Sequence, residues 1–470
     1  MKKTLILGLA LALVGGVAYA NFCARDVVPA ASLLVPYAVV DLNADGTPNS
    51  AGYTTLFAVT NVSSAYALVH ITVWSAQSNP VVDWDELLTG YDVWTINFRD
   101  LLTGNFNLFD TGAAKLAPKP TTGPPVYGPS SNIYTTALPV PVDPTVPISG
   151  CNFPYGARVT LGPIITGKLQ ADITAQLKQY VPCKGSVPNF TSPPWLTGLT
   201  ANPVFFYVTA DVVTTCNTYF PNQGQYWTAN TGQTKFPASR NVLIGDVIWV
   251  NSTTNYSESV PAVHLEAGLT MTQNFYTRYA VTNLDDREPL ATAFGFRYIS
   301  SGASTNIIVW KDSNEADWDT DSTSATYNTP NNDTGITYAC RPYVYYAFDE
   351  SENALARGGG GPSGFDIAEP NVIPFETQSA PLNATNWDGI PAANGWMLLV
   401  FDPSIPRTDQ FTPTVHQAWV GVRYLSAGYS TALEAAVLAN ANCFTGQVLP
   451  RLGINAAPYG TFSTAGTYLP

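Results

Sequence analysis

Apolar and polar residues alternate strongly between residues 54 and 105. In residues 67–74 every odd-numbered position is Ala, Val or Ile, and the even-numbered positions include His70. Residues 54–61 and 92–99 alternate in the same way. Successive side chains leave opposite faces of a pleated strand, so a period of two is typical of a half-buried strand. These three runs therefore predict neighbouring strands of a β-sandwich.

Further strands are predicted along the whole chain, separated by turn-forming residues. They cover residues 31–41, 203–215, 241–251, 291–299, 306–310, 338–348, 395–401 and 417–424. Residues 430–441 have a helix-favouring composition, but the short turn after Tyr424 favours a hairpin, and we predict a strand. Residues 169–180 form the one predicted helix, because apolar residues recur there at helical spacing. Regular strands without a βαβ rhythm predict an all-β fold of two antiparallel Ig-like β-sandwich modules.

The domain organisation follows from a change of composition and an internal echo. Residues 113–150 carry nine prolines, which predict a long Pro-rich insertion and not a central strand. Residues 278–283 resemble residues 56–61, and residues 306–310 resemble residues 71–74. The matching order favours a duplicated sandwich. The predicted units are a signal peptide (1–20), an N-terminal sandwich region (21–262), a C-terminal sandwich (263–445) and a tail (446–470).

The first twenty residues have the form of a secretory signal peptide. Lys2 and Lys3 precede an apolar run at residues 5–17, and Ala-Tyr-Ala at residues 18–20 is a cleavage signal. We therefore expect a secreted or cell-surface protein without a membrane span after cleavage. Cleavage leaves a formal charge of 19 − 34 = −15. This acidic balance argues against a nucleic-acid partner, whose phosphates require clustered Lys and Arg.

Cysteine usage agrees with export. An even number of cysteines in an exported chain predicts up to three disulfides, although fifteen pairings are compatible with the sequence. A local pairing within the C-terminal half and two bridges among the others is our expectation, and free buried thiols are the alternative. The six candidates are Cys23, Cys151, Cys183, Cys216, Cys340 and Cys443.

Several segments in a fixed order carry a resemblance to known sequences. They are ASLLVPY, TTLFAVTN, LTGYDVWTINFRD, YVTADVV, NVLIGDVIWVN, DREPLAT and IIVWKDS, and together they span most of the mature chain. The series resembles a group of exported all-β hypothetical proteins from environmental bacteria. The resemblance implies secretion and a β-rich build, and it implies no activity and no site residues.

Calcium is the small partner that the sequence favours most. Five acids crowd within ten residues, and packed carboxylates repel one another unless a cation or solvent relieves them. A solvated acidic loop is the commoner explanation of such a cluster and the one we prefer, and calcium binding is the alternative. A second match, at residues 41–46, lacks the acid of a complete calcium loop and predicts a plain turn. The five candidate ligands are Asp312, Glu315, Asp317, Asp319 and Asp321.

Catalytic patterns are weak. The three histidines, His70, His264 and His416, are scattered, and His70 is predicted to lie on a sheet surface. Acids at residues 83–92 with nearby tryptophans resemble the carboxylates and platforms of a glycosidase. Turn-forming acids and core tryptophans explain the same residues, and we prefer that interpretation.

The predicted function is a secreted structural or adhesive protein that binds a surface protein, a glycan or a second copy of itself. A secreted carbohydrate-active or other hydrolase is the first alternative, and an outer-membrane β-barrel is the second. An enzyme is the less favoured class. No cofactor is expected, and calcium is the one candidate ligand.

Overall fold

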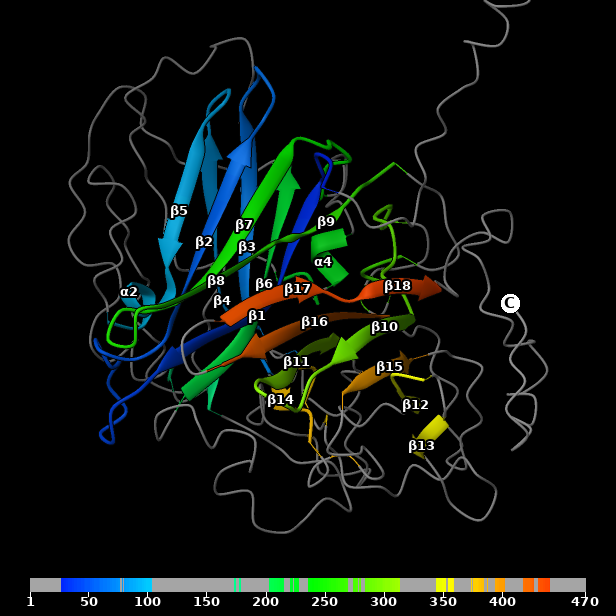
Figure 1. The fold of residues 1–470 in the computed structure, drawn as a ribbon. Coiled ribbons are helices and arrows are strands. Elements are labelled where there is room, and N and C mark those ends of the chain that lie inside the picture. Colours follow the sequence, from blue (N-terminus) through cyan, green and yellow to red (C-terminus); the bar gives the residue numbers. More distant parts are fainter. Residues whose placement is uncertain are drawn as a thin grey trace, which may run out of the picture.

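A computed structural model describes residues 27–76, 78, 80–103, 173–174, 177–178, 203–214, 220–222, 224–227, 236–268, 274–277, 279, 284–312, 344–351, 354–358, 373, 375–383, 387, 394–401, 417–426 and 430–439. In these ranges the chain forms two β-sandwiches made of four antiparallel sheets (Figure 1). The predicted all-β sandwich class is confirmed. The predicted signal peptide, the Pro-rich insertion and the tail lie outside the described residues.

The first sandwich contains a five-stranded and a four-stranded sheet. The five-stranded sheet has the order β4-β3-β6-β1-β9, formed by Pro80–Leu88, Ala67–Ser75, Pro203–Val213, Ser32–Asp41 and Val263–Leu265. The four-stranded sheet has the order β5-β2-β7-β8, formed by Val93–Asn97, Thr54–Asn61, Leu243–Asn251 and Tyr256–Pro261. β9 follows the predicted boundary at residue 262 and pairs with β1.

The second sandwich has the same two-sheet build. Its five-stranded sheet has the order β13-β12-β15-β10-β18, formed by Ala354–Gly358, Val344–Asp349, Gly395–Val400, Ala293–Tyr298 and Ala436–Ala439. Its four-stranded sheet has the order β14-β11-β16-β17, formed by Thr377–Pro381, Ser304–Lys311, Ala418–Leu425 and Ser430–Glu434. The hairpin partner predicted after Tyr424 is confirmed, because β17 pairs with β16.

The two sandwiches are topological repeats of each other. Adding nine to each strand number converts the order β4-β3-β6-β1-β9 into β13-β12-β15-β10-β18. The same operation converts β5-β2-β7-β8 into β14-β11-β16-β17. Every antiparallel pairing of the first sandwich therefore has a counterpart in the second.

The sequence echo that suggested duplication does not match equivalent strands. β2 corresponds to β11 and β3 to β12, whereas the echo paired the residues of β3 with those of β11. Its other half, residues 278–283, lies outside the described residues except for Tyr279, which is in a turn. An apolar-Ala-Val-Thr-Asn segment is common chemistry for a strand that runs into a turn, so its recurrence does not identify equivalent positions.

Alternation places one face of each strand in a shared core. In the first sandwich Trp84 and Trp94 meet across the two sheets with ring centroids 6.1 Å apart. Phe206 of β6 packs against Phe98, which follows β5 directly, with ring centroids 5.2 Å apart. The described tryptophans are buried, apart from the partly buried Trp396, and the expectation that tryptophans belong to the core is confirmed.

The helices of the described residues are short. α2 covers Phe98–Thr103 and α4 covers Gly224–Trp227. The predicted helix near residues 169–180 is helical at Ile173 and Leu177, which are buried in the first core as their spacing predicted. No helix in the described part of the chain is long and apolar enough to cross a membrane.

The outward face of β14-β11-β16-β17 joins the second sandwich to the first. Ile308, Trp310 and Trp419 belong to the core cluster of the first sandwich, whereas their neighbours Ile307 and Val309 belong to that of the second. Arg423 of β16 reaches Glu258 of β8 with a distance of 2.7 Å between its Nε and the carboxylate Oε2. Aromatic packing and a buried ion pair thus fix the two sandwiches to each other.

Candidate functional site

A row of polar residues crosses the outward face of the five-stranded sheet of the first sandwich, β4-β3-β6-β1-β9. The strand register pairs Asp85 of β4 with His70 of β3, His70 with Asp211 of β6, and Asp211 with Ser32 of β1. Directly paired residues point to the same face of a sheet. The acids of β4 therefore lie within a strand, and our expectation that they form a turn was wrong.

His70 lies between two carboxylates. Its Nδ1 is 2.8 Å from Asp85 Oδ1, and its Nε2 is 3.4 Å from Asp83 Oδ2. All three side chains are buried, so the prediction of a surface histidine was also wrong. Burial lowers the pKa of His70, but the two carboxylates outweigh this effect and raise the pKa to about 10. The imidazole is therefore a buried cation at neutral pH.

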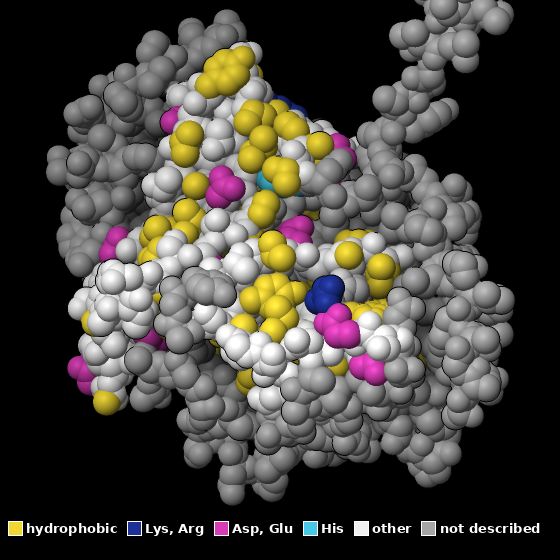
Figure 2. All heavy atoms as spheres, in the orientation of Figure 1, with side chains coloured by type: hydrophobic (Ala, Val, Ile, Leu, Met, Phe, Trp, Pro, Cys, Tyr) yellow, Lys and Arg dark blue, Asp and Glu magenta, His cyan; other side chains and the backbone are white. Residues whose placement is uncertain are grey.

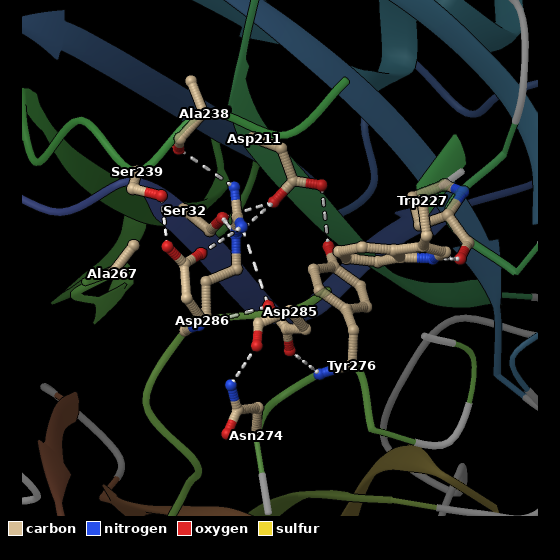
Figure 3. A network of polar contacts seen from close by, with 12 residues as sticks. Ser32, Asp211, Trp227, Ala238, Ser239, Ala267, Asn274, Tyr276, Asp285 and Asp286 are labelled. Carbon is tan, nitrogen blue, oxygen red and sulfur yellow. Dashed lines mark hydrogen bonds and ion pairs between the residues drawn. The ribbon is translucent and has the colours of Figure 1, made fainter. Parts of the chain in front are cut away.

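Asp211 is the centre of a second buried cluster, shown in Figure 3. Its Oδ2 accepts hydrogen bonds from the hydroxyls of Tyr226 and Tyr276, each at 2.9 Å. Its Oδ1 accepts a hydrogen bond from Ser32 and lies 3.5 Å from Nε of Arg287. The phenol hydrogen bonds and the cation together compensate a carboxylate that has lost its water.

Arg287 connects this cluster to the segment that leads into the second sandwich. Its Nη1 is 3.6 Å from Asp285 Oδ1 and 3.5 Å from Asp286 Oδ1, and its Nη2 donates to the carbonyl of Ala238 at 3.4 Å. Burial lowers the pKa of the guanidinium, but Asp211 and Asp285 raise it further than burial lowers it. Arg287 therefore stays charged and ties β6 to the residues before β10.

Asp285 shapes the same segment through its backbone partners. Its side chain accepts hydrogen bonds from the amides of Tyr276, at 2.7 Å, and Arg287, at 3.1 Å. Its own carbonyl accepts a hydrogen bond from the side chain of Asn274. Burial raises the pKa of Asp285 to about 6, and Arg287 limits the rise.

The buried clusters are closed to substrate. The side chains of His70, Asp85, Asp211 and Arg287 are all at most 3% exposed. Tyr276 and Arg287, from the residues before β10, bind Asp211 and Ser32 on this face of the sheet. General acid–base chemistry requires a group within reach of the substrate. The ion pairs of Arg287 therefore fix the residues before β10 to the sheet that contains Asp211.

The glycosidase interpretation of residues 83–92 does not fit this geometry. Asp83 and Asp85 point to one face of the sheet, and Trp84 points to the other, into the sandwich core against Trp94. A sugar platform requires an aromatic face open to the ligand. Asp92 lies in a turn, where its Oδ2 accepts a hydrogen bond from the amide of Thr89 at 3.1 Å.

The calcium candidates are only partly described. Asp312 is buried at the end of β11, and its amide donates to the carbonyl of Gln417 at 2.9 Å. The other four acids, Glu315, Asp317, Asp319 and Asp321, lie outside the described residues, and their role stays a prediction. No group of three His, Cys, Asp or Glu side chains suited to a metal occurs in the ranges that the structure describes.

The turn predicted at residues 41–46 is confirmed. The amide of Gly46 donates to the carbonyl of Asn43 at 2.9 Å, and Gly46 has a φ of 86°. Asp45 accepts hydrogen bonds from the amide and hydroxyl of Thr47, which lower its pKa. Asp41 instead accepts from the amide of Tyr53 at 2.8 Å. The two acids thus serve separate parts of the loop.

The remaining candidates are settled only in part. Nε2 of His264 in β9 accepts a hydrogen bond from the amide of Gly245 in β7 at 3.1 Å, so His264 links the two sheets of the first sandwich. His416 lies outside the described residues. So do all six candidate cysteines, Cys23, Cys151, Cys183, Cys216, Cys340 and Cys443, and the disulfides stay a prediction.

An exposed feature lies at the turn between β4 and β5, at the top of the sheet in Figure 1. Tyr91 is 71% exposed with a φ of 60°, and Val93 is 50% exposed. The amide of Tyr91 donates to the carbonyl of Ser63 at 3.0 Å. A Cβ added at Gly90 would lie 2.2 Å from the carbonyl oxygen of Ser64, so the two neighbouring turns are in close contact. The turn that exposes Tyr91 is therefore fixed by its contacts with residues 63–64.

Sequence reasoning missed the partners of Asp211. A carboxylate within the apolar strand YVTADVV was a usable signal, because a charge in a buried strand requires a compensating group. Arg287 is 76 residues further along the chain, outside the predicted strands. The register between β3 and β6 that places His70 beside Asp211 also has no local signature.

Comparison with known proteins adds no relative from which a site could be transferred. No protein-family model matches the chain, and the searches of curated proteins and of solved structures gave no match.

Proposed function

We propose that the mature chain is a secreted or cell-surface structural and adhesive protein that binds a protein or a glycan. The observation that carries the proposal is the exposed turn at Tyr91. It presents a large amphipathic side chain, whereas the strongest charged clusters of the described residues are buried within the fold.

The backbone of Tyr91 supports a binding role. A bulky residue at positive φ is unusual, and such strain persists where its surroundings hold it and is concentrated at functional sites. The hydrogen bond to Ser63 and the close approach of Gly90 to Ser64 hold this turn. Tyrosine has few rotatable bonds and offers both an apolar ring and a hydroxyl, which suits contact with a protein or a sugar.

The build of the molecule supports a mechanical role. Two sandwiches with one topology are joined by aromatic packing and by the Arg423–Glu258 pair. The connecting segment is further fixed by Arg287. The composition, with 12% charged and 12% aromatic residues, and the predicted signal peptide agree with an extracellular location.

Binding of the mature protein to cells, to purified surface polysaccharides and to an array of glycans tests the proposal. Tyr91→Ser should lower binding at least about tenfold, the equivalent of about 1.4 kcal/mol. Leu433→Ser is the matched control, because it removes another exposed apolar side chain (55% exposed) on the second sandwich. Release of reducing ends from the polysaccharides would instead support the hydrolase alternative, and binding unchanged by Tyr91→Ser would refute the role of this turn.

A further inference from the structure

The outward face of the four-stranded sheet β5-β2-β7-β8, here called the open face, carries aliphatic side chains interspersed with polar ones. Its side chains alternate with the core residues of the same strands and are half-buried or exposed. Figure 2 shows apolar side chains gathered over this sheet with few charged ones between them. The open face consists of Leu56, Ala58, Thr60, Val93, Thr95, Asn97, Ile244, Asp246, Ile248, Val250, Ser257, Ser259 and Pro261.

The equivalent face of the second sandwich is buried. Adding nine to the strand numbers of the open face gives β14-β11-β16-β17, whose outward side chains include Ile308, Trp310 and Trp419. These residues pack against the first sandwich, where Trp310 contacts Tyr207 with ring centroids 5.8 Å apart. The protein therefore already uses this sheet face of its repeat as a contact between sandwiches. Within the described ranges, the first sandwich presents the same face without such a contact.

One edge of the open face lies next to that contact. β8 forms this edge and lies beside β17. Glu258, on the opposite, inward face of β8, binds Arg423 of β16. Asp246 is the one charged residue among the outward positions of this sheet. Low charge is typical of the centre of a protein–protein interface.

The size of the open face suits a pair of molecules. Four strands about 4.8 Å apart, with about seven residues each at 3.3 Å, span roughly 19 by 23 Å. Two such faces in contact would bury about 900 Å², slightly less than a standard specific interface, which fits a weak and reversible association.

We propose that two copies of this chain associate through their open faces, β5-β2-β7-β8 against β5-β2-β7-β8. This inference rests on the proposed function and deepens it, because it names a second copy of the chain as one partner. A contact of a surface with the same surface of a second copy closes after two molecules. The association therefore gives a dimer that presents two Tyr91 turns.

Sedimentation velocity of the mature protein at concentrations between about 1 and 100 µM measures the association. A weak interface of this size should have a dissociation constant within about this range. A mass of two chains is expected in the upper part of this range. Val93→Asp and Ile248→Asp should raise the dissociation constant at least about tenfold, because each places a charge in the contact. Val93 is 50% exposed in the free molecule, so its replacement keeps the fold, which the far-UV circular dichroism spectrum checks.

Leu433→Asp is the matched control, since it adds the same charge at an exposed apolar strand residue of the second sandwich. It should leave the dissociation constant unchanged. A wild-type protein that stays monomeric at 100 µM would overturn the inference, and so would a dimer that both open-face variants leave intact. Failure of the inference and failure of the proposed function are separable. A monomer that still binds cells or glycans through Tyr91 refutes only the dimer, and a dimer that binds neither refutes only the adhesive role.

Discussion

The stability of the first sandwich should fall as the pH rises above neutrality, because His70 is buried as a cation. In the folded protein the carboxylates of Asp83 and Asp85 raise the pKa of His70 to about 10, from an ordinary value of 6.5. Unfolding exposes the imidazole to water and restores the ordinary value. Between these two values the folded state holds a proton that the unfolded state has released.

The sign and the size follow from this difference. A pKa raised in the folded state contributes stability that is fully present below pH 6.5 and is lost as the pH rises through about 10. Each pH unit in this window should remove about 1.4 kcal/mol from the free energy of unfolding. The whole window corresponds to a loss on the order of 5 kcal/mol, a large share of the roughly 5–15 kcal/mol that stabilises an ordinary domain.

Urea unfolding at pH 7, 8 and 9, followed by tryptophan fluorescence, measures the slope. His70→Gln is the control, because it lacks the titrating ring and should lose most of the slope even though its stability is lower at pH 7. The imidazole resonances of His70 give a second measurement, and their titration should lie above pH 9. A stability that does not change between pH 7 and 9, or an imidazole that titrates near pH 6.5, would refute the reasoning.

Three further substitutions test the contacts that hold the fold together. Arg287→Met leaves Asp211 without its cation and should cost about 3–5 kcal/mol of unfolding free energy in urea denaturation. Gly52→Ala places a Cβ 2.3 Å from the Cβ of Asp41 and should lower the free energy of unfolding by about 1–3 kcal/mol. Gly224→Ala is its control, because a Cβ added at Gly224 would meet no atom within 4 Å, and it should leave the melting temperature within about a degree of wild type. Arg423→Gln weakens the link between the sandwiches, and calorimetry should resolve two unfolding transitions in place of one.

The sequence predicted the strands best where the alternation was uninterrupted. β2 and β3 coincide with predicted alternating runs, and β6 coincides with a predicted strand of nearly continuous apolar residues. β4 was missed, since three acids in a row of nine residues lower the strand propensity and resemble a turn. The strand forms because His70 of β3 compensates two of these acids, and this compensation depends on a pairing that local sequence does not encode.

The candidate site was predicted less well than the fold, for a related reason. The hydroxyls and the guanidinium that bind Asp211 come from residues 32, 226, 276 and 287, which lie in four separate segments outside β6. Their meeting depends on the sheet order and on the course of the connecting segment. The exposure and the positive φ of Tyr91 follow from the packing of its turn against residues 63–64.

The two repeats differ in the residues that they place on equivalent sheet faces, and this difference bears on how each face is used. The buried face of β14-β11-β16-β17 carries Trp310 and Trp419, whose rings need permanent cover. The open face carries Leu56, Ile248 and smaller side chains mixed with threonine and serine. Large aromatic side chains are costly to leave in water, whereas small aliphatic ones are tolerated on a soluble surface. A face of small aliphatic and hydroxyl side chains can be exposed in the free molecule and buried when a second copy binds. The composition of the open face therefore fits a reversible association better than a permanent contact.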